Sequence, residues 1–289
     1  MSIPAAFDYH PAQTVDEALS LLQQYGDDAK ILAGGHSLIP AMKLRLAQPE
    51  HLVDIGRIQG LSYIKEEQDT IAIGALTTYT QIERSDLLQQ YFPLMVECAS
   101  IIADQQVRNR GTIGGSIAHA DPAGDMPGVI LALKGEIVVQ GPGGKRTIAA
   151  DDFILGAFET ALEPDEIVIE LRFARPPAHT GSAYQKLANQ ASHYAIVGSA
   201  VVLTLDANKT CTAASVVITG ASMKTERSRA VEQALIGKQL DTATITDAAS
   251  HAADELELVS DIHGSEEYRK QMASVIVRRT INSALERIS

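Results

Sequence analysis

Hydrophobic and polar positions alternate with two different periods along the chain, and the change of period separates expected helices from expected strands. The first clear helical period begins after Thr14, a typical N-cap residue, with Glu17 three positions later as its capping-box partner. The apolar positions that follow have the spacing i, i+3, i+4 and are Ala18, Leu21 and Leu22. This spacing predicts an amphipathic helix that ends at the Gly-Asp-Asp sequence of residues 26–28.

The remainder of the first 176 residues consists of short apolar runs and short helical periods. Strands are predicted at residues 30–33, 51–55, 70–75, 136–140, 148–153 and 166–173. Helices are predicted at residues 38–46, 79–88 and 92–104. Residues 141–146, Gly-Pro-Gly-Gly-Lys-Arg, predict a hairpin turn. The glycine spacing of a phosphate-binding P-loop is absent there, and Arg146 stands where Ser or Thr is required.

The sequence Arg175-Pro176-Pro177 interrupts this pattern and predicts a linker. Beyond it, runs rich in β-forming residues predict strands at residues 183–187, 194–205 and 212–220. Helical periods then follow at residues 226–236, 245–258 and 266–286. This order predicts an α+β domain in which a three-stranded sheet is backed by helices.

Composition and charge narrow the class of protein. The 289 residues include 45% hydrophobic and 21% charged residues, which are ordinary values for a globular protein. The formal net charge of −12 argues against nucleic acid and anionic membranes as partners. Cys98 and Cys211 are the two cysteines, so a disulfide framework, a four-cysteine zinc site and a self-contained iron–sulfur cluster are excluded. No apolar run has membrane-spanning length and the N-terminus does not resemble a signal peptide, so we expect a cytoplasmic protein.

Two glycine-rich segments carry the candidate chemistry. Residues 33–37, Ala-Gly-Gly-His-Ser, lie between a predicted strand and a predicted helix, and residues 112–116 read Thr-Ile-Gly-Gly-Ser. Adjacent glycines allow the backbone to approach a ligand and to direct N–H groups toward it. One such pair is most simply a tight turn, but two pairs flanked by hydroxyl groups suit a diphosphate and hence a dinucleotide. The Rossmann fingerprint is absent from both segments, which disfavours a Rossmann domain.

These two segments resemble the paired FAD motifs of the flavoprotein subunit of molybdenum hydroxylases, the family of carbon monoxide dehydrogenase and xanthine dehydrogenase. The matching residues are Ala33 to Pro40 and Thr112 to Gly115, in the order and spacing of the family. The resemblance begins at Phe7, extends to the final helix, and is strongest to the medium subunit of the carbon monoxide dehydrogenase type. After the second motif the family pattern has an Asn-rich run, whereas residues 116–122 here read Ser-Ile-Ala-His-Ala-Asp-Pro, so the substrate stays open.

The resemblance implies an α+β fold with a vanillyl-alcohol-oxidase-like (PCMH-type) FAD-binding domain. That domain occupies residues 1–176, in subdomains of about 1–56 and 57–176, and a C-terminal flavoprotein domain occupies residues 177–289. The residues that the resemblance assigns to the FAD diphosphate are Leu32, Ala33, Gly34, Gly35, His36, Ser37, Leu38 and Ile39 in the first loop and Thr112, Ile113, Gly114, Gly115 and Ser116 in the second. The residues that it assigns to the flavin and its polar chain are Ile102, Asp125, Val168, Lys186 and Tyr194.

The resemblance also implies partners and a reaction. FAD passes electrons from the two 2Fe-2S clusters of a small subunit to an external acceptor, and a large subunit carries the molybdenum cofactor. We expect a dimer of such heterotrimers, without catalytic acid–base residues, nucleophiles or metal ligands in this chain. The roles of His36 and His119 stay open.

Two alternatives remain at this point. One is a free-standing flavin oxidoreductase of the same fold, and the other is a non-catalytic nucleotide-binding or assembly protein. Flavin absorption bands would exclude the second alternative, and dependence of turnover on partner subunits would exclude the first.

Overall fold

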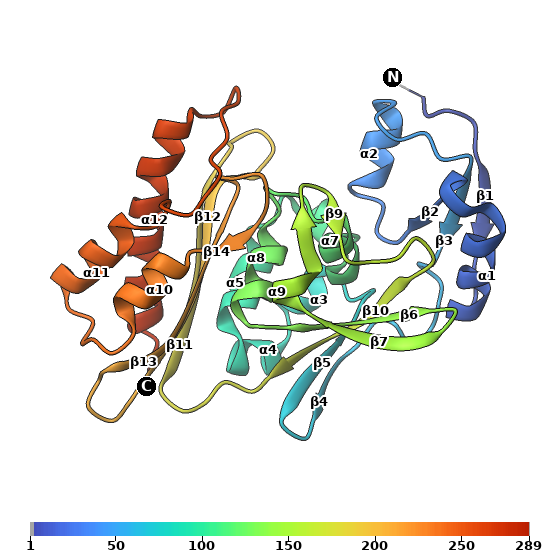
Figure 1. The fold of residues 1–289 in the computed structure, drawn as a ribbon. Helices are drawn as coiled ribbons and strands as arrows, with labels where there is room; N and C mark the ends of the chain where they lie inside the picture. Colours follow the sequence, from blue (N-terminus) through green and yellow to red (C-terminus); the bar gives the residue numbers. More distant parts are fainter. Residues whose placement is uncertain (1–2, 289) are drawn as a thin grey trace.

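The computed structural model describes residues 3–288 and contains three main sheets in a row (Figure 1). No helix in this described part of the chain is long and apolar enough to cross a membrane. The first sheet is parallel, with the order β1-β3-β2, and consists of β1 (Asp8–Pro11), β2 (Ala29–Leu32) and β3 (His51–Asp54). Helix α1 (Val15–Tyr25), the short 3-10 helix η1 (Gly26–Asp28) and α2 (Leu38–Lys43) complete this first unit.

The predicted start of α1 is confirmed in detail. The hydroxyl of Thr14 accepts a hydrogen bond from the backbone N–H of Glu17 at 3.1 Å. The Glu17 carboxylate accepts from the N–H of Gln13 at 2.7 Å, one position before the N-cap. The local capping signal therefore fixes this end of the helix.

The central sheet is antiparallel and has the order β4-β5-β10-β6-β7. Its strands are β4 (Ile64–Glu67), β5 (Thr70–Gly74), β6 (Glu136–Gly141), β7 (Gly144–Ala149) and β10 (Ile167–Ala174). The helices beside it are α3 (Tyr79–Glu83), α4 (Asp86–Tyr91), α5 (Pro93–Ser100), α6 (Gln105–Arg108), α7 (Ile113–His119), α8 (Asp125–Ala132) and α9 (Ala150–Phe153). A small hairpin of β8 (Ile154–Gly156) and β9 (Glu159–Thr160) follows α9.

The C-terminal sheet has the order β11-β12-β13-β14. Its strands are β11 (Thr180–Ala188), β12 (Ala195–Leu205), β13 (Cys211–Thr219) and β14 (Glu226–Arg227). Helices α10 (Arg229–Leu235), α11 (Thr242–Ser250) and α12 (Glu266–Leu285) cover its outer face, and α5 and α8 lie on its other side (Figure 1). Tyr184, Ala200 and Val217 of this sheet belong to the same buried core as the central helices.

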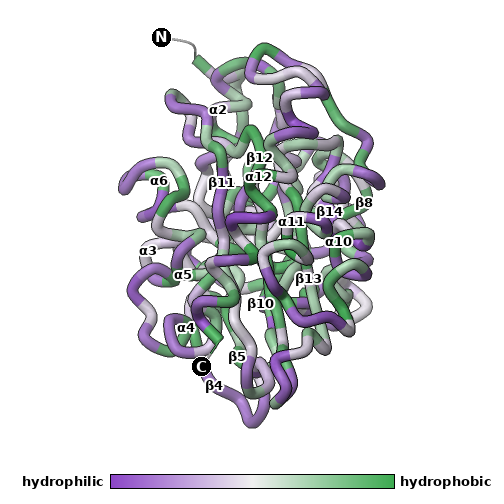
Figure 2. The backbone as a smooth tube through the Cα atoms, turned by 90° about the vertical axis from the view of Figure 1, so that its left-hand side faces the viewer, coloured by the Kyte–Doolittle hydropathy of each residue, from purple (hydrophilic) through white to green (hydrophobic). Residues whose placement is uncertain are grey.

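The hydropathy of the backbone follows this layering. In Figure 2 the hydrophobic stretches run along inner strands such as β10, whereas the turn between β4 and β5 is hydrophilic. The predicted hairpin turn at residues 141–146 is confirmed, because Gly141 pairs with Gly144 at the end of the β6–β7 ladder.

Several element predictions were wrong in their bounds. Residues 79–88 form two helices rather than one, because Ser85 caps a new helix by accepting from the N–H of Leu88. The helix predicted at residues 92–104 ends at Ser100, since Ala103 has a φ of 43° and Asp104 caps α6. The strand predicted at residues 148–153 stops at Ala149 and gives way to α9, whose first turn carries two acidic residues.

The C-terminal sheet has four strands rather than three. The fourth, β14, has two residues and is too short to be recognised from alternation; it pairs with Val217 and Ile218. The helix predicted at residues 226–236 therefore begins later, as α10. The helix predicted at residues 245–258 is α11, which begins earlier, at Thr242, and ends earlier, at Ser250.

Candidate functional site

The two glycine loops lie against each other. A Cβ atom on Gly34 would stand 2.1 Å from the carbonyl oxygen of Arg110, and one on Gly115 would stand 3.9 Å from Cβ of Ala33. The first of these distances is far inside van der Waals contact, so only glycine fits at position 34. Loops that are far apart in the sequence are thus joined into one structure at the junction of the first and central units.

The first loop leaves backbone donors without protein acceptors. In the described part of the chain, none of the N–H groups of residues 34–37 donates a hydrogen bond to a protein atom. Gly35 has a φ of 78°, a conformation that L-residues rarely adopt. Its carbonyl oxygen accepts from the N–H of Ile39, and the imidazole Nδ1 of His36 lies 3.1 Å from the carbonyl oxygen of Gly34. Four neighbouring amides in a partly exposed turn are a donor set suited to the oxygens of a diphosphate.

The second loop differs from what its sequence suggested, because its amides are engaged within the protein. The N–H of Ile113 donates to the carbonyl of Thr77 at 3.0 Å, and that of Gly114 donates to the carbonyl of Ala75 at 2.9 Å. The N–H of Gly115 donates to the Thr112 hydroxyl at 3.2 Å. The idea that this loop also directs free N–H groups toward a ligand is therefore wrong.

The second glycine pair instead permits close packing. A Cβ atom on Gly114 would lie 2.5 Å from Cβ of Ala75, and Thr112 is the N-cap of α7. Gly115 and Ser116 remain partly exposed beside the first loop and are the part of this segment that a ligand can reach. The two loops therefore differ: the amides of residues 34–37 have no protein acceptor in the described part of the chain, whereas those of Ile113 to Gly115 bond within the fold.

Asp125 forms a buried cluster with two residues of β11. Its Oδ2 atom accepts from Nζ of Lys186 at 2.7 Å, and its Oδ1 atom accepts from the hydroxyl of Tyr184 at 2.5 Å. Only 6% of the Asp125 side chain and 4% of the Lys186 side chain are exposed, so this is an ion pair largely withdrawn from water. Burial raises the pKa of Asp125, and the Lys186 ammonium and the Tyr184 hydroxyl oppose that rise.

Lys186 also holds the segment that leads to Tyr194. Its Nζ atom donates to the carbonyl oxygen of His193 at 2.7 Å. The Tyr194 side chain is 45% exposed, and its pKa is raised by partial burial and by the nearby carboxylates of Asp121 and Asp125. The structure therefore brings the predicted site residues Asp125, Lys186 and Tyr194 together, although Tyr194 follows Asp125 by 69 positions in the sequence.

Two predicted residues lie apart from this cluster. Val168 is 6% exposed and belongs to the central core on β10, and Ile102 packs partly buried against the same core. Their predicted contact with a flavin ring stays a prediction. Leu32 ends β2, and Leu38 and Ile39 begin α2, so these three frame the first loop.

Sequence reasoning missed three residues that support the site. Tyr184 binds Asp125, and its position two residues before Lys186 on a strand, hence on the same face, was the available signal. The hydroxyl of Thr219 donates to the carbonyl oxygens of Pro122 and Gly124, both at 2.8 Å, and so holds the turn before Asp125. Tyr79 is buried beneath the second loop, where a Cβ atom on Gly111 would meet its ring at 2.7 Å.

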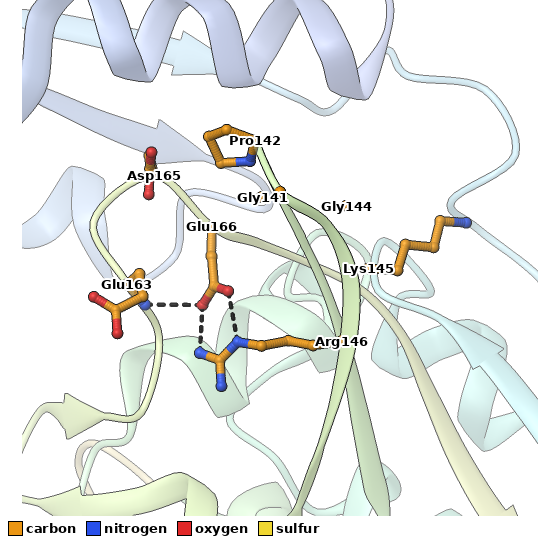
Figure 3. A pocket seen from close by; sticks show the side chains of 9 residues that line it. Gly141, Pro142, Gly144, Lys145, Arg146, Glu163, Asp165 and Glu166 are labelled. Carbon is orange, nitrogen blue, oxygen red and sulfur yellow. Dashed lines mark hydrogen bonds and ion pairs between the residues drawn. The ribbon is translucent and has the colours of Figure 1, made fainter.

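A hollow of about 300 Å³ at residues 141–146 is separate from the glycine loops (Figure 3). Arg146 is one of its lining residues, and its Nε and Nη2 atoms donate to Glu166 at 2.6 and 2.7 Å. The guanidinium is therefore neutralised by a carboxylate of this chain. This arrangement supports the hairpin interpretation and does not resemble a phosphate site.

The chain matches two protein families over nearly its whole length. Residues 5–178 match the FAD-binding domain in molybdopterin dehydrogenase, and residues 182–284 match the CO dehydrogenase flavoprotein C-terminal domain. It is 42% identical to the carbon monoxide dehydrogenase medium chain of Hydrogenophaga pseudoflava, with 99% of each chain covered. It is 39% identical to subunit alpha of the 6-hydroxypseudooxynicotine dehydrogenase complex of Paenarthrobacter nicotinovorans, covering 98% of this chain and 96% of that one.

Solved structures give the same result for the fold. The carbon monoxide dehydrogenase structure from Hydrogenophaga pseudoflava that lacks the Mo-pyranopterin moiety superposes with a TM-score of 0.96, at 44% identity over 99% of this chain and 100% of that chain. Quinoline 2-oxidoreductase from Pseudomonas putida 86 superposes with a TM-score of 0.91, at 31% identity over 98% of each chain.

Proposed function

The chain belongs to the family of FAD-binding subunits of molybdenum hydroxylases, and from this premise we propose that its first glycine loop holds the diphosphate of FAD while the Asp125–Lys186 cluster supports the flavin end. The observation that carries the proposal is the set of four unpaired amides at residues 34–37, which fits a diphosphate. The proposed contacts of the remaining predicted residues, Ile102 and Val168 included, follow from the family resemblance.

When bound, FAD supplies redox chemistry: it accepts electrons from a partner's iron–sulfur clusters and delivers them to an external acceptor. The residues of this chain bind and orient the cofactor. The N–H groups of the first loop would donate hydrogen bonds to the diphosphate oxygens and Tyr194 would cover the ring. Lys186 fixes both the Asp125 carboxylate and the backbone beside Tyr194.

The wider assembly forms part of the proposal. The chain works with an iron–sulfur small subunit and a molybdenum-cofactor large subunit, as a dimer of heterotrimers in the cytoplasm. We divide it into a FAD-binding domain at residues 1–176, with subdomains of about 1–56 and 57–176, and a C-terminal domain at residues 177–289. The substrate of the complex is not specified, because substrate binds on another subunit.

We expect FAD to be bound non-covalently. The imidazole of His36 lies against the carbonyl of Gly34, and that of His119 lies 5.1 Å from the ring of Phe158, so neither is directed to a flavin by the contacts that it makes. Denaturation followed by ultrafiltration should release all flavin absorbance into the filtrate. Absorbance that stays with the polypeptide would contradict this expectation.

Replacing Gly35 with valine should weaken FAD binding by at least about tenfold, or about 1.4 kcal/mol. The residue has a φ of 78°, and a Cβ atom would stand 3.2 Å from both Leu32 Cδ1 and Ile39 Cγ1, so the loop must change shape. FAD titration of the apoprotein by fluorescence measures the change.

Gly237 provides a matched control for this variant. Its φ of 80° is equally strained for valine, but nothing lies within 4 Å of its Cβ position. Gly237→Val should lose similar backbone stability and keep wild-type FAD affinity. Equal affinity in Gly35→Val and wild type would remove the first loop from the site.

The isolated chain should bind FAD yet oxidise no substrate, because its two cysteines cannot hold an iron–sulfur cluster. Under anaerobic conditions, carbon monoxide, aldehydes and N-heterocycles should leave the flavin absorbance unchanged, whereas dithionite should bleach it. Addition of both partner subunits should restore turnover. Bleaching by a substrate without partners would favour the free-standing oxidoreductase.

A further inference from the structure

The β8–β9 hairpin exposes two large apolar side chains beside the proposed flavin site. Leu155 is 52% exposed and Phe158 is 59% exposed, although the residues before them, Phe153 and Ile154, are buried. The hairpin is therefore anchored in the core at its base and presents apolar groups at its tip. Figure 1 shows β9 next to α7, the helix that begins at the second glycine loop.

The hairpin tip is held in a strained conformation. Phe158 has a φ of 58° and Ala120 has a φ of 47°, and these two left-handed residues are joined by a 3.1 Å hydrogen bond from the N–H of Phe158 to the carbonyl of Ala120. A bulky residue in this region costs about 1–2 kcal/mol relative to glycine. The phenyl ring packs on His119, with ring centroids 5.1 Å apart, rather than into the core. Folding alone gains little from a phenylalanine here.

The hairpin is connected to the residues that face the flavin. Ala120, which accepts the hydrogen bond of Phe158, immediately precedes Asp121, whose nearby carboxylate helps to raise the pKa of Tyr194. An electron donor must approach the flavin closely, and this exposed apolar tip lies one hydrogen bond and one residue away from the Asp121–Tyr194 pair.

The charged residues of the segment around the hairpin are all acidic. Residues 147–171 contain seven Asp or Glu residues and no Lys or Arg. Three of the seven are neutralised by arginines outside the segment, namely Asp151, Glu166 and Glu170. The other four have no ion pair in the described part of the chain: Glu163 and Asp165 line the hollow at residues 141–146, whereas Asp152 lies just before β8 and Glu159 begins β9. A partner surface that complements this hairpin has an apolar recess surrounded by Lys or Arg side chains.

We propose that the β8–β9 hairpin docks the iron–sulfur subunit, with Phe158 as the anchor in an apolar recess and the carboxylates of Asp152 and Glu159 facing a basic rim. This inference rests on the proposed function, because it places the electron donor at the face that Tyr194 occupies. Aromatic anchors of this kind carry a large part of interface affinity.

The experiment uses the full-length chain with FAD and measures its dissociation constant for the purified iron–sulfur subunit. Phe158→Gly should keep wild-type FAD content and an equal or higher melting temperature, because glycine relieves the positive φ. It should nevertheless bind the iron–sulfur subunit at least about tenfold more weakly. A merely structural role for Phe158 predicts the opposite: lower stability with unchanged affinity.

Ile236→Asp is the matched control, since Ile236 is 46% exposed on the far end of α10. It should bind within about twofold of wild type, whereas Phe158→Asp should bind more weakly than Phe158→Gly. The double variant Asp152→Asn with Glu159→Gln should show a weaker dependence of affinity on salt.

Wild-type affinity in both Phe158 variants overturns the inference and leaves the proposed function intact. The inference is also overturned if the Phe158 variants bind the molybdenum subunit more weakly but bind the iron–sulfur subunit normally, because the hairpin then contacts a different partner. A wild-type chain that binds neither FAD nor the iron–sulfur subunit overturns the proposed function itself.

Discussion

Replacing Lys186 with methionine should lower the free energy of unfolding by about 3–5 kcal/mol at pH 7. The substitution leaves the Asp125 carboxylate buried with only the Tyr184 hydroxyl as a partner. It also removes the donor to the carbonyl of His193, so the backbone beside Tyr194 loses an anchor. Denaturant unfolding of the purified chain measures the change.

The pH dependence of this variant has a defined sign. Without the ammonium group, burial raises the pKa of Asp125 further above its unfolded value of about 3.9. The folded state then binds a proton that the unfolded state has released, so stability falls as the pH rises through this window. Unfolding free energies of Lys186→Met should therefore be highest in acid and decrease toward neutral pH relative to wild type.

The double variant Asp125→Asn with Lys186→Met is the control. It removes both charges, so most of the loss and the additional pH slope should disappear. If Lys186→Met is as stable as wild type at pH 7, the ion pair is not the buried unit that its 2.7 Å geometry indicates.

Gly114→Val should destabilise the fold by roughly 3 kcal/mol or more, and not simply weaken FAD binding. The new side chain would collide with Ala75, whose Cβ, carbonyl oxygen and Cα lie 2.5, 2.8 and 2.9 Å from the Cβ position. It would also break the hydrogen bond from the N–H of Gly114 to that carbonyl. The melting temperature of the apoprotein reports the effect without any cofactor.

Gly143→Val is the comparison for this prediction, because no atom lies within 4 Å of the Gly143 Cβ position. Its melting temperature should stay close to that of wild type. Should Gly114→Val melt like Gly143→Val but lose FAD, the second loop would be a ligand-binding loop rather than a packing contact.

Local signals made some of the structure predictable from sequence. Thr14 and Glu17 specify a helix start through atoms within four residues, and the Gly-rich turn at 141–146 joins two adjacent strands. The fold class, the cofactor and the family were identified from two motifs, and the comparisons confirm them. The helix breaks at Ser85 and Ala103 were not predicted, because the helical spacing of apolar residues continues across them.

The arrangement of the site depended on contacts that no local pattern contains. Whether the amides of Gly114 and Gly115 are free is decided by the carbonyl of Ala75 and by the Thr112 hydroxyl. The pairing of Asp125 with Lys186 requires the C-terminal sheet to lie against α8, which is a property of the tertiary fold. The free N–H groups of the first loop depend on the shape of its own backbone, so a local sequence pattern was able to indicate them.

The hydrogen bonds from the C-terminal sheet to the Pro122–Gly124 turn can form only late in translation of the chain. Thr219 and Gly220 reach the carbonyl of Pro122 only after 97 further residues have been translated, which takes roughly 5–20 s at ribosomal rates. Until then the nascent chain exposes the central core surface that Tyr184, Ala200 and Val217 later cover. The Pro122–Gly124 turn before Asp125 therefore gains its contacts with Thr219 and Gly220 only after the C-terminal sheet has been synthesised.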